Sequence, residues 1–253
     1  MGEALSQFVE EAQHLSASFD SATVFSIAGW DVSQYVLYMF IALVLVLLIV
    51  LISGRKLELI PHKKFTATVE YGYNFIGEGF KKHIPFLATL FFMILIANVI
   101  GLIPGAKAAM GTISITWALA AISFIYFNFY GLKELGVFRY MKSFAPSGVP
   151  APMVPVIWFL EFVSMVIRVL TLAVRLYGNM LAGHMVLAGF SLATTIFLQF
   201  AVFNMDFVTA LPAVAWFFLL FFMYALETLV AFLQAYVFTI LSSSYIGMAI
   251  HPH

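Results

Sequence analysis

Long apolar segments recur along most of this sequence, and they restrict the fold to one that spans a membrane. Each segment has about 17 or more residues, which is enough to cross a hydrocarbon core roughly 30 Å thick. Hydrophobic residues make up 63% of the 253 residues and charged residues only 9%, whereas soluble domains are roughly a quarter charged. We therefore predict an all-α membrane protein, with one polytopic domain over residues 1–253. The expected helices cover Tyr35–Ile52, Ile84–Ile103, Ile113–Leu132, about Pro155–Phe203 and about Val208–Ile246.

Composition excludes several classes of function. The chain has no cysteine, which excludes disulfide frameworks, iron–sulfur clusters, thiolate zinc sites and cysteine nucleophiles. No metal or cofactor site is predicted. The net charge is zero, and the basic residues form no stripe with interleaved aromatics, so nucleic acid is not an expected partner. The N-terminus has no basic region followed by a short apolar run, so we expect no cleavable signal peptide.

The distribution of charge predicts the orientation in the membrane. Residues 1–34 are acidic and contain no Lys or Arg, whereas nine of the twelve basic residues lie in the segments 53–83 and 133–154. By the positive-inside rule both segments are cytoplasmic or on the matrix side, so five crossings leave the acidic N-terminus outside. Segment 53–83 is also amphipathic, which predicts an interfacial helix or, alternatively, a soluble loop. The nine residues are Arg55, Lys56, Lys63, Lys64, Lys81, Lys82, Lys133, Arg139 and Lys142.

Residues 155–246 are predicted to form a long helical hairpin. A helix of about 40 residues reaches about 60 Å, twice the hydrocarbon thickness, so both helices must tilt strongly or bend. In an antiparallel hairpin, residues at equal distances from the turn face each other. Two polar pairs, Arg175 with Gln234 and His184 with Glu227, both centre the turn near residue 205. Asn204 and Asp206 supply a polar break at that point.

Arg175 lies deep inside the first helix of this hairpin, far from either end. A charge at the centre of a spanning helix costs about 2.5–3.5 kcal/mol on insertion scales, and it persists mainly where a cavity or partner stabilises it. Glu161, Arg168 and Arg175 follow one another at steps of seven and therefore form one stripe on the helix. We expect a functional role for Arg175. Arg168 has the alternative of extending its side chain to the membrane surface.

Further polar residues share the faces of these two helices. Asn179 lies one turn after Arg175, and Gln234 lies seven residues after Glu227. Gly183 reduces side-chain bulk, which allows another helix to approach closely. A carboxylate that faces an imidazole can relay protons, and the alternative is that these residues serve only as polar contacts between helices.

The segment Arg175-Leu-Tyr-Gly-Asn-Met-Leu-Ala-Gly-His184 resembles the signature of the a subunit of the rotary F-type ATP synthase. The similarity covers most of the chain, from Asn98-Val-Ile-Gly-Leu-Ile-Pro104 to Gln234-Ala-Tyr-Val-Phe238. The resemblance implies a stator with two long tilted helices that curve against a rotating ring of c subunits. It also implies b-type stalk subunits and further synthase subunits as partners, and a bacterial plasma membrane more than an organelle inner membrane.

The family resemblance also implies roles for individual residues. Arg175 would face the ring carboxylate and separate two aqueous half-channels, and Glu161 matches the carboxylate of the cytoplasmic half-channel. Polar positions near the arginine or in the other half-channel match Asn179, His184, Glu227 and Gln234. Some bacterial relatives carry the acid and the imidazole in exchanged positions. The chain would not itself be an enzyme, because it has no P-loop of the form G-x-x-x-x-G-K-[ST].

A stand-alone ion-coupled transporter or channel with a buried arginine is the alternative function. Such a protein often contains inverted repeats or interrupted helices at matching positions in its two halves. The polar residues singled out here are instead concentrated in the last hundred residues, which favours the stator.

Overall fold

The computed structural model describes residues 23–27, 30–54, 81–103, 105–144, 151–203 and 207–250. Five of its helices are long and apolar enough to cross a membrane, which confirms the all-α membrane fold. These are α2 (Gln34–Gly54), α4 (Ile84–Gly101), α5 (Ile113–Leu135), α7 (Val154–Phe203) and α8 (Phe207–Ile250). The shorter elements are β1 (Thr23–Ile27), β2 (Trp30–Ser33), η2 (Lys81–His83), η3 (Ala109–Gly111), α6 (Val137–Lys142) and η4 (Ala151–Met153).

Local residue chemistry explains where the shorter spanning helices begin and end. Pro85 lies in the first turn of α4, where its missing N–H has no helical partner to lose. Helix α5 ends at Leu135 and is followed by Gly136, whose positive φ of 76° is readily adopted by glycine. The side chains of these helices are apolar around most of the circumference, as expected for segments in contact with lipid or with other helices.

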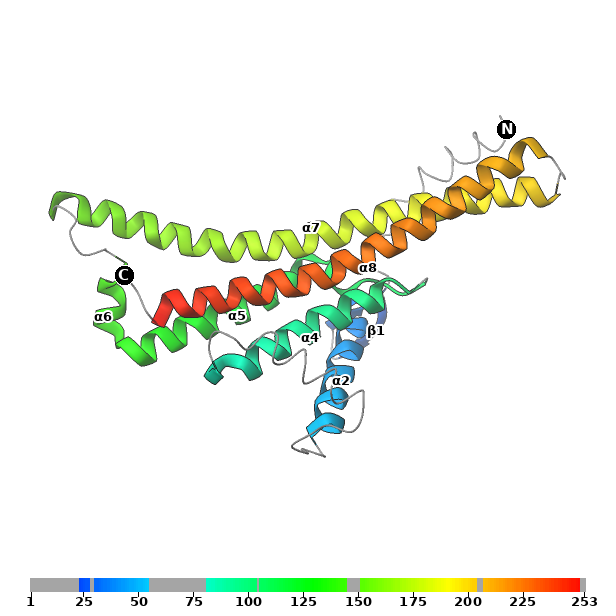
Figure 1. Cartoon of the computed structure of the whole chain (residues 1–253). Coiled ribbons are helices and arrows are strands. Elements are labelled where there is room, and N and C mark those ends of the chain that lie inside the picture. Colours follow the sequence, from blue (N-terminus) through cyan, green and yellow to red (C-terminus); the bar gives the residue numbers. More distant parts are fainter. Residues whose placement is uncertain are drawn as a thin grey trace.

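Helices α7 and α8 form the predicted antiparallel hairpin. They contain 50 and 44 residues, and at about 1.5 Å per residue both are much longer than a hydrocarbon core of roughly 30 Å. Figure 1 shows them side by side, with α7 bowed along its length, while α2 crosses their direction at a steep angle. Helix α7 ends at Phe203 and α8 begins at Phe207, which confirms the position of the turn.

The core lies between the hairpin and the shorter helices. Leu176 and Met180 of α7 pack with Ile94 of α4 and Phe238 of α8, and each is at most 1% exposed. Small residues such as Ala235, which is fully buried, allow the helix backbones to approach closely. A second cluster joins α4, α5, α6, α7 and α8 around Met165 and Val169 of α7, so the two long helices are held at several points along their length.

Two features differ from the sequence-based expectation. The segment expected to be a loop after residue 132 instead continues α5 to Leu135 and then forms the short helix α6. The segment expected to be only an acidic N-terminus contains the antiparallel strands β1 and β2. The interfacial helix predicted over 53–83 lies mostly outside the described residues.

Candidate functional site

The polar stripe predicted on α7 is present, and two of its residues form an ion pair. Arg168 Nη2 donates to Glu161 Oε1 at 3.2 Å, and both side chains are partly exposed. Arg168 Nη1 also lies 3.8 Å from the sulfur of Met248 on α8. The Arg168 guanidinium therefore has a carboxylate partner on its own helix.

Arg175 lies on the exposed surface of α7. It forms no hydrogen bond or ion pair with the other residues that the structure describes. The neighbouring Leu176 is completely buried in the core, so the helix backbone is fixed while the guanidinium points outward. The arrangement presents a fixed cation to whatever packs against this face of the hairpin.

Glu227 lies against Gly183, its neighbour across the hairpin. A Cβ built at residue 183 would overlap the Glu227 carboxylate, so only glycine leaves room for this side chain. The pair is centred on residue 205, in agreement with the predicted register. Glu227 is 7% exposed, and its Oε1 has no hydrogen-bond partner among the described residues, so the structure holds a carboxyl group within the helix pair.

His184 points toward the end of α4 instead. Its Nε2 lies 3.1 Å from the position of a Cβ at Gly101, and this nitrogen is buried without a partner among the described residues. The expected contacts of His184 with Glu227 and of Arg175 with Gln234 are therefore not present as hydrogen bonds in the described structure. The contact of Gly183 with Glu227 agrees with the predicted register, but the His184 imidazole lies beside Gly101 instead.

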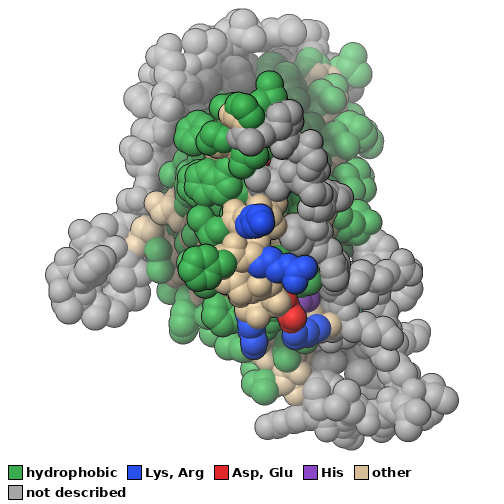
Figure 2. All heavy atoms as spheres, turned by 90° about the vertical axis from the view of Figure 1, so that its left-hand side faces the viewer, with side chains coloured by type: hydrophobic (Ala, Val, Ile, Leu, Met, Phe, Trp, Pro, Cys, Tyr) green, Lys and Arg blue, Asp and Glu red, His purple; other side chains and the backbone are tan. Residues whose placement is uncertain are grey.

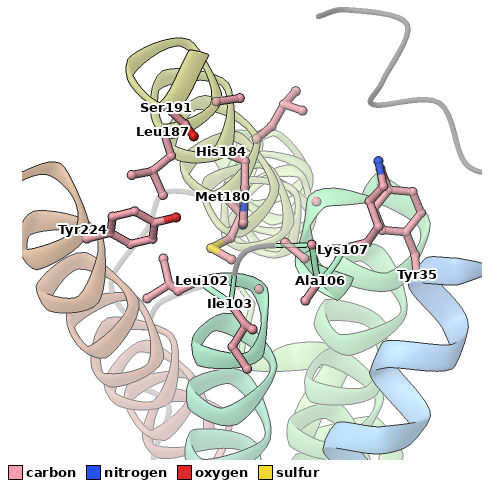
Figure 3. A pocket seen from close by; sticks show the side chains of 16 residues that line it. Tyr35, Leu102, Ile103, Ala106, Lys107, Met180, His184, Leu187, Ser191 and Tyr224 are labelled. Carbon is pink, nitrogen blue, oxygen red and sulfur yellow. The ribbon is translucent and has the colours of Figure 1, made fainter. Parts of the chain in front are cut away.

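A cavity of about 310 Å³ opens beside His184. Polar groups line it from four parts of the chain: Lys107 after α4, Tyr35 on α2, Ser191 on α7 and Tyr224 on α8. Figure 3 shows Tyr224 on the far side of the cavity from Lys107 and Tyr35, with His184 between them. The cavity is large enough for several water molecules, and its hydroxyl and imidazole groups can both donate and accept protons.

Buried amides complete the polar interior. Gln234 is 8% exposed, and the Asn179 Nδ2 atom is buried without a partner among the described residues. Asn98 on α4 is completely buried, and neither of its side-chain polar atoms has a described partner. Such groups are costly to bury unless they are hydrogen-bonded, so they mark positions where water or a polar group is favoured.

Sequence reasoning did not assign roles to several residues of this site. Lys107, Tyr35 and Tyr224 come together only through packing between distant segments, and no local pattern predicts their convergence. The same is true of the buried hydrogen bond of 3.0 Å from Ser123 on α5 to Ser242 on α8. Asn98 could have been found as the only amide in an otherwise apolar predicted helix.

Ionisable groups therefore lie on both sides of Arg175 along α7. Glu161 and Arg168 lie toward the start of the helix, and His184 with its cavity lies toward the hairpin turn. Each region has groups that can carry a proton, and Arg175 lies between them as a fixed positive charge. Arg175 therefore divides the ionisable groups of α7 into two regions.

Comparison with known proteins gives the family of this chain. The model of the ATP synthase A chain family matches residues 36–247. A protein named ATP synthase subunit a from Nitrobacter hamburgensis is 37% identical over 223 residues, which cover 85% of this chain and 87% of the relative. A protein of the same name from Hyphomonas neptunium is 38% identical, over 85% of both chains. Another, from a Wolbachia strain, is 34% identical, over 88% of this chain and 91% of the relative. The chain belongs to the ATP synthase A chain family.

Proposed function

We propose that this chain is the proton-translocating stator subunit of an ATP synthase membrane sector. The observation that carries the proposal is Arg175, an exposed cation in the middle of an apolar helix, in a chain of this family. A guanidinium in contact with lipid tails is unfavourable, so its face requires a polar partner. A carboxylate on a ring of c subunits supplies that partner and is attracted by the cation.

Two half-channels divided by Arg175 follow from this assignment. His184, Glu227 and the adjoining cavity form the outer half, and Glu161 with Arg168 forms the half that opens to the cytoplasm. Asn179 and Gln234 contribute hydrogen-bonding groups near the arginine. Because a nearby cation favours the ionised form of a carboxyl group, Arg175 promotes proton release from each passing ring subunit. It also opposes the direct passage of a proton from one half to the other.

The chain acts as one component of a larger machine. A proton that crosses about 100 mV releases roughly 2.3 kcal/mol, and the half-channels direct this free energy into rotation of the ring. Nucleotide chemistry belongs to other subunits, since the sequence has no P-loop. The c-ring, b-type stalk subunits and the remaining synthase subunits are the partners. A bacterial plasma membrane is the location, in keeping with the bacterial relatives.

Substitution of Arg175 tests the proposal. In membranes that contain the whole synthase, Arg175→Ala should abolish ATP-driven proton pumping, and Arg175→Lys should restore little because a flexible ammonium does not reproduce the planar guanidinium. Assembly of the complex should be nearly normal, since the exposed side chain makes no contact with the core. Normal pumping by an assembled Arg175→Ala complex would refute the proposed role of this residue.

A further inference from the structure

Helix α6 is held in a fixed orientation on the end of the helix bundle. Tyr140 is 6% exposed, and its hydroxyl donates to Asn128 Oδ1 of α5 at 2.8 Å. A Cβ at Gly131 would lie 2.5 Å from the Tyr140 ring, so the ring packs directly on the α5 backbone. From the other side, Trp158 Nε1 donates to the carbonyl of Met141 at 3.0 Å. One face of α6 is therefore always turned inward.

Large apolar side chains of α6 are exposed beside Tyr140, at Val137 and Met141, and opposite it, at Phe138. At 100° per residue, positions 138 and 142 point away from Tyr140. Phe138 is 94% exposed, the largest value among the large apolar side chains that the structure describes, and Val137 and Met141 are 62% and 44% exposed. Exposed apolar groups that adjoin one another mark an interaction surface, and here the surface belongs to a helix that cannot turn it inward.

Three cations belong to α6 and the end of α5, next to these apolar side chains in the sequence. Lys133, Arg139 and Lys142 are exposed, and none of them has a carboxylate partner among the described residues. The nearby carboxylate of Glu134 is already paired with Lys82 at 2.6 Å. Figure 2 shows Lys and Arg side chains gathered on this end of the molecule among apolar ones. The surface therefore carries an excess of positive charge.

The position of α6 in the chain indicates that this surface contacts the membrane boundary. The helix begins two residues after α5, a membrane-spanning helix, has ended, so it lies at the depth where the hydrocarbon gives way to headgroups. Short amphipathic elements with aromatic and basic residues bind at this depth. Basic residues close to the cytoplasmic ends of spanning helices recognise anionic headgroups.

We propose that α6 and the end of α5 form a binding site for an anionic phospholipid. Phe138 enters the boundary between headgroups and acyl chains, and Val137 and Met141 extend this apolar contact. Lys133, Arg139 and Lys142 bind the phosphate, to which Arg139 can donate two parallel hydrogen bonds. An acidic segment of another protein would satisfy the cations, but it would not account for an almost fully exposed phenylalanine beside the end of a membrane helix.

Lipid retention by the full chain tests this site separately from proton transport. The purified chain is placed in nanodiscs of phosphatidylcholine with increasing fractions of phosphatidylglycerol, and retained lipid is counted by native mass spectrometry after release into mild detergent. The wild-type chain should retain phosphatidylglycerol in preference to phosphatidylcholine. Each of Arg139→Gln and Lys142→Gln should weaken retention about fivefold, the factor that corresponds to about 1 kcal/mol per basic residue at an anionic surface.

Matched variants separate this effect from general damage. Lys107→Gln removes a cation at the outer cavity and should leave retention unchanged, and Arg139→Lys should keep most of it. Phe138→Ser should weaken retention of both lipids. Equal retention of phosphatidylglycerol by wild type and by Arg139→Gln and Lys142→Gln would overturn the proposal. It would also be overturned if a photocrosslinker at residue 138 reacted, in the whole synthase, with another subunit and with no lipid.

Discussion

The carboxylate of Glu227 occupies the space where a side chain at residue 183 would begin. This contact joins α7 to α8 within the polar region near His184. It leaves Glu227 almost completely buried, although a carboxyl group is strongly disfavoured in an apolar interior without a partner. Glycine is therefore required at residue 183, because any larger residue would overlap the Glu227 carboxyl group.

Gly183→Ala should displace the Glu227 carboxylate and reduce ATP-driven proton pumping by roughly tenfold or more, since the new methyl group cannot fit beside it. The cost in stability should be about 1–3 kcal/mol, the usual range for overpacking. Gly189→Ala is the matched control, because a Cβ at Gly189 meets nothing within 4 Å. Adding Glu227→Asp to Gly183→Ala should recover part of the activity, since the shorter side chain leaves space. Equal pumping by the two alanine variants would contradict this account.

The Glu161–Arg168 ion pair predicts coupling between its two residues. Glu161→Gln and Arg168→Gln should each reduce proton pumping, and the double variant should lose less than the two separate losses combined. In thermal unfolding of the full chain in nanodiscs, the coupling should be about 0.2–1 kcal/mol, because the pair is partly exposed. Arg168→Lys should keep most of the activity. If the losses in proton pumping of the two single variants simply added up in the double variant, the ion pair would not contribute to function.

Because the His83 imidazole is buried, we expect the folded chain to lose stability in mild acid. Burial lowers the pKa of the His83 imidazole from its usual value of 6.5, and the charge of Lys82 lowers it further. The unfolded chain then binds a proton at a pH where the folded chain does not, so stability is greatest above about pH 6.5 and falls below it. The melting temperature of the wild-type chain should therefore fall more between pH 7.5 and pH 5.5 than that of His83→Gln. If the melting temperatures of the wild-type chain and of His83→Gln fell equally, His83 would not be the cause of the pH dependence.

Much of the fold could be predicted because the bilayer sets the length of each apolar segment. Helix α4 was expected from Ile84, and it begins there; α7 was expected to end at Phe203, and it does. The hairpin register followed from polar residues that must avoid lipid and therefore meet at equal depths. The contact of Gly183 with Glu227 has this register.

The local partners of the site residues could not be predicted in the same way. The sequence placed Glu161 and Arg168 on one stripe, but it did not specify an ion pair between them. His184 packs beside Gly101 and the cavity with Lys107, because the segment after α4 folds back against α7. Helix α6 was missed for a similar reason, since it is held by contacts with distant residues: the bond from the buried Tyr140 to Asn128, and the bond from Trp158 to the Met141 carbonyl. Such contacts form between segments that are distant in the sequence, and the periodicity of a single helix does not predict them.

The separation of the two half-paths can be measured by labelling from each side of the membrane. The chain has no cysteine, so Ser164→Cys, on the stripe between Glu161 and Arg168, and Ser191→Cys, in the cavity beside His184, each introduce a single thiol. In membranes with the whole synthase, a membrane-impermeant thiol reagent should label residue 191 only from the outside and residue 164 only from the cytoplasmic side. Labelling of both positions from the same side would contradict the two half-channels divided by Arg175.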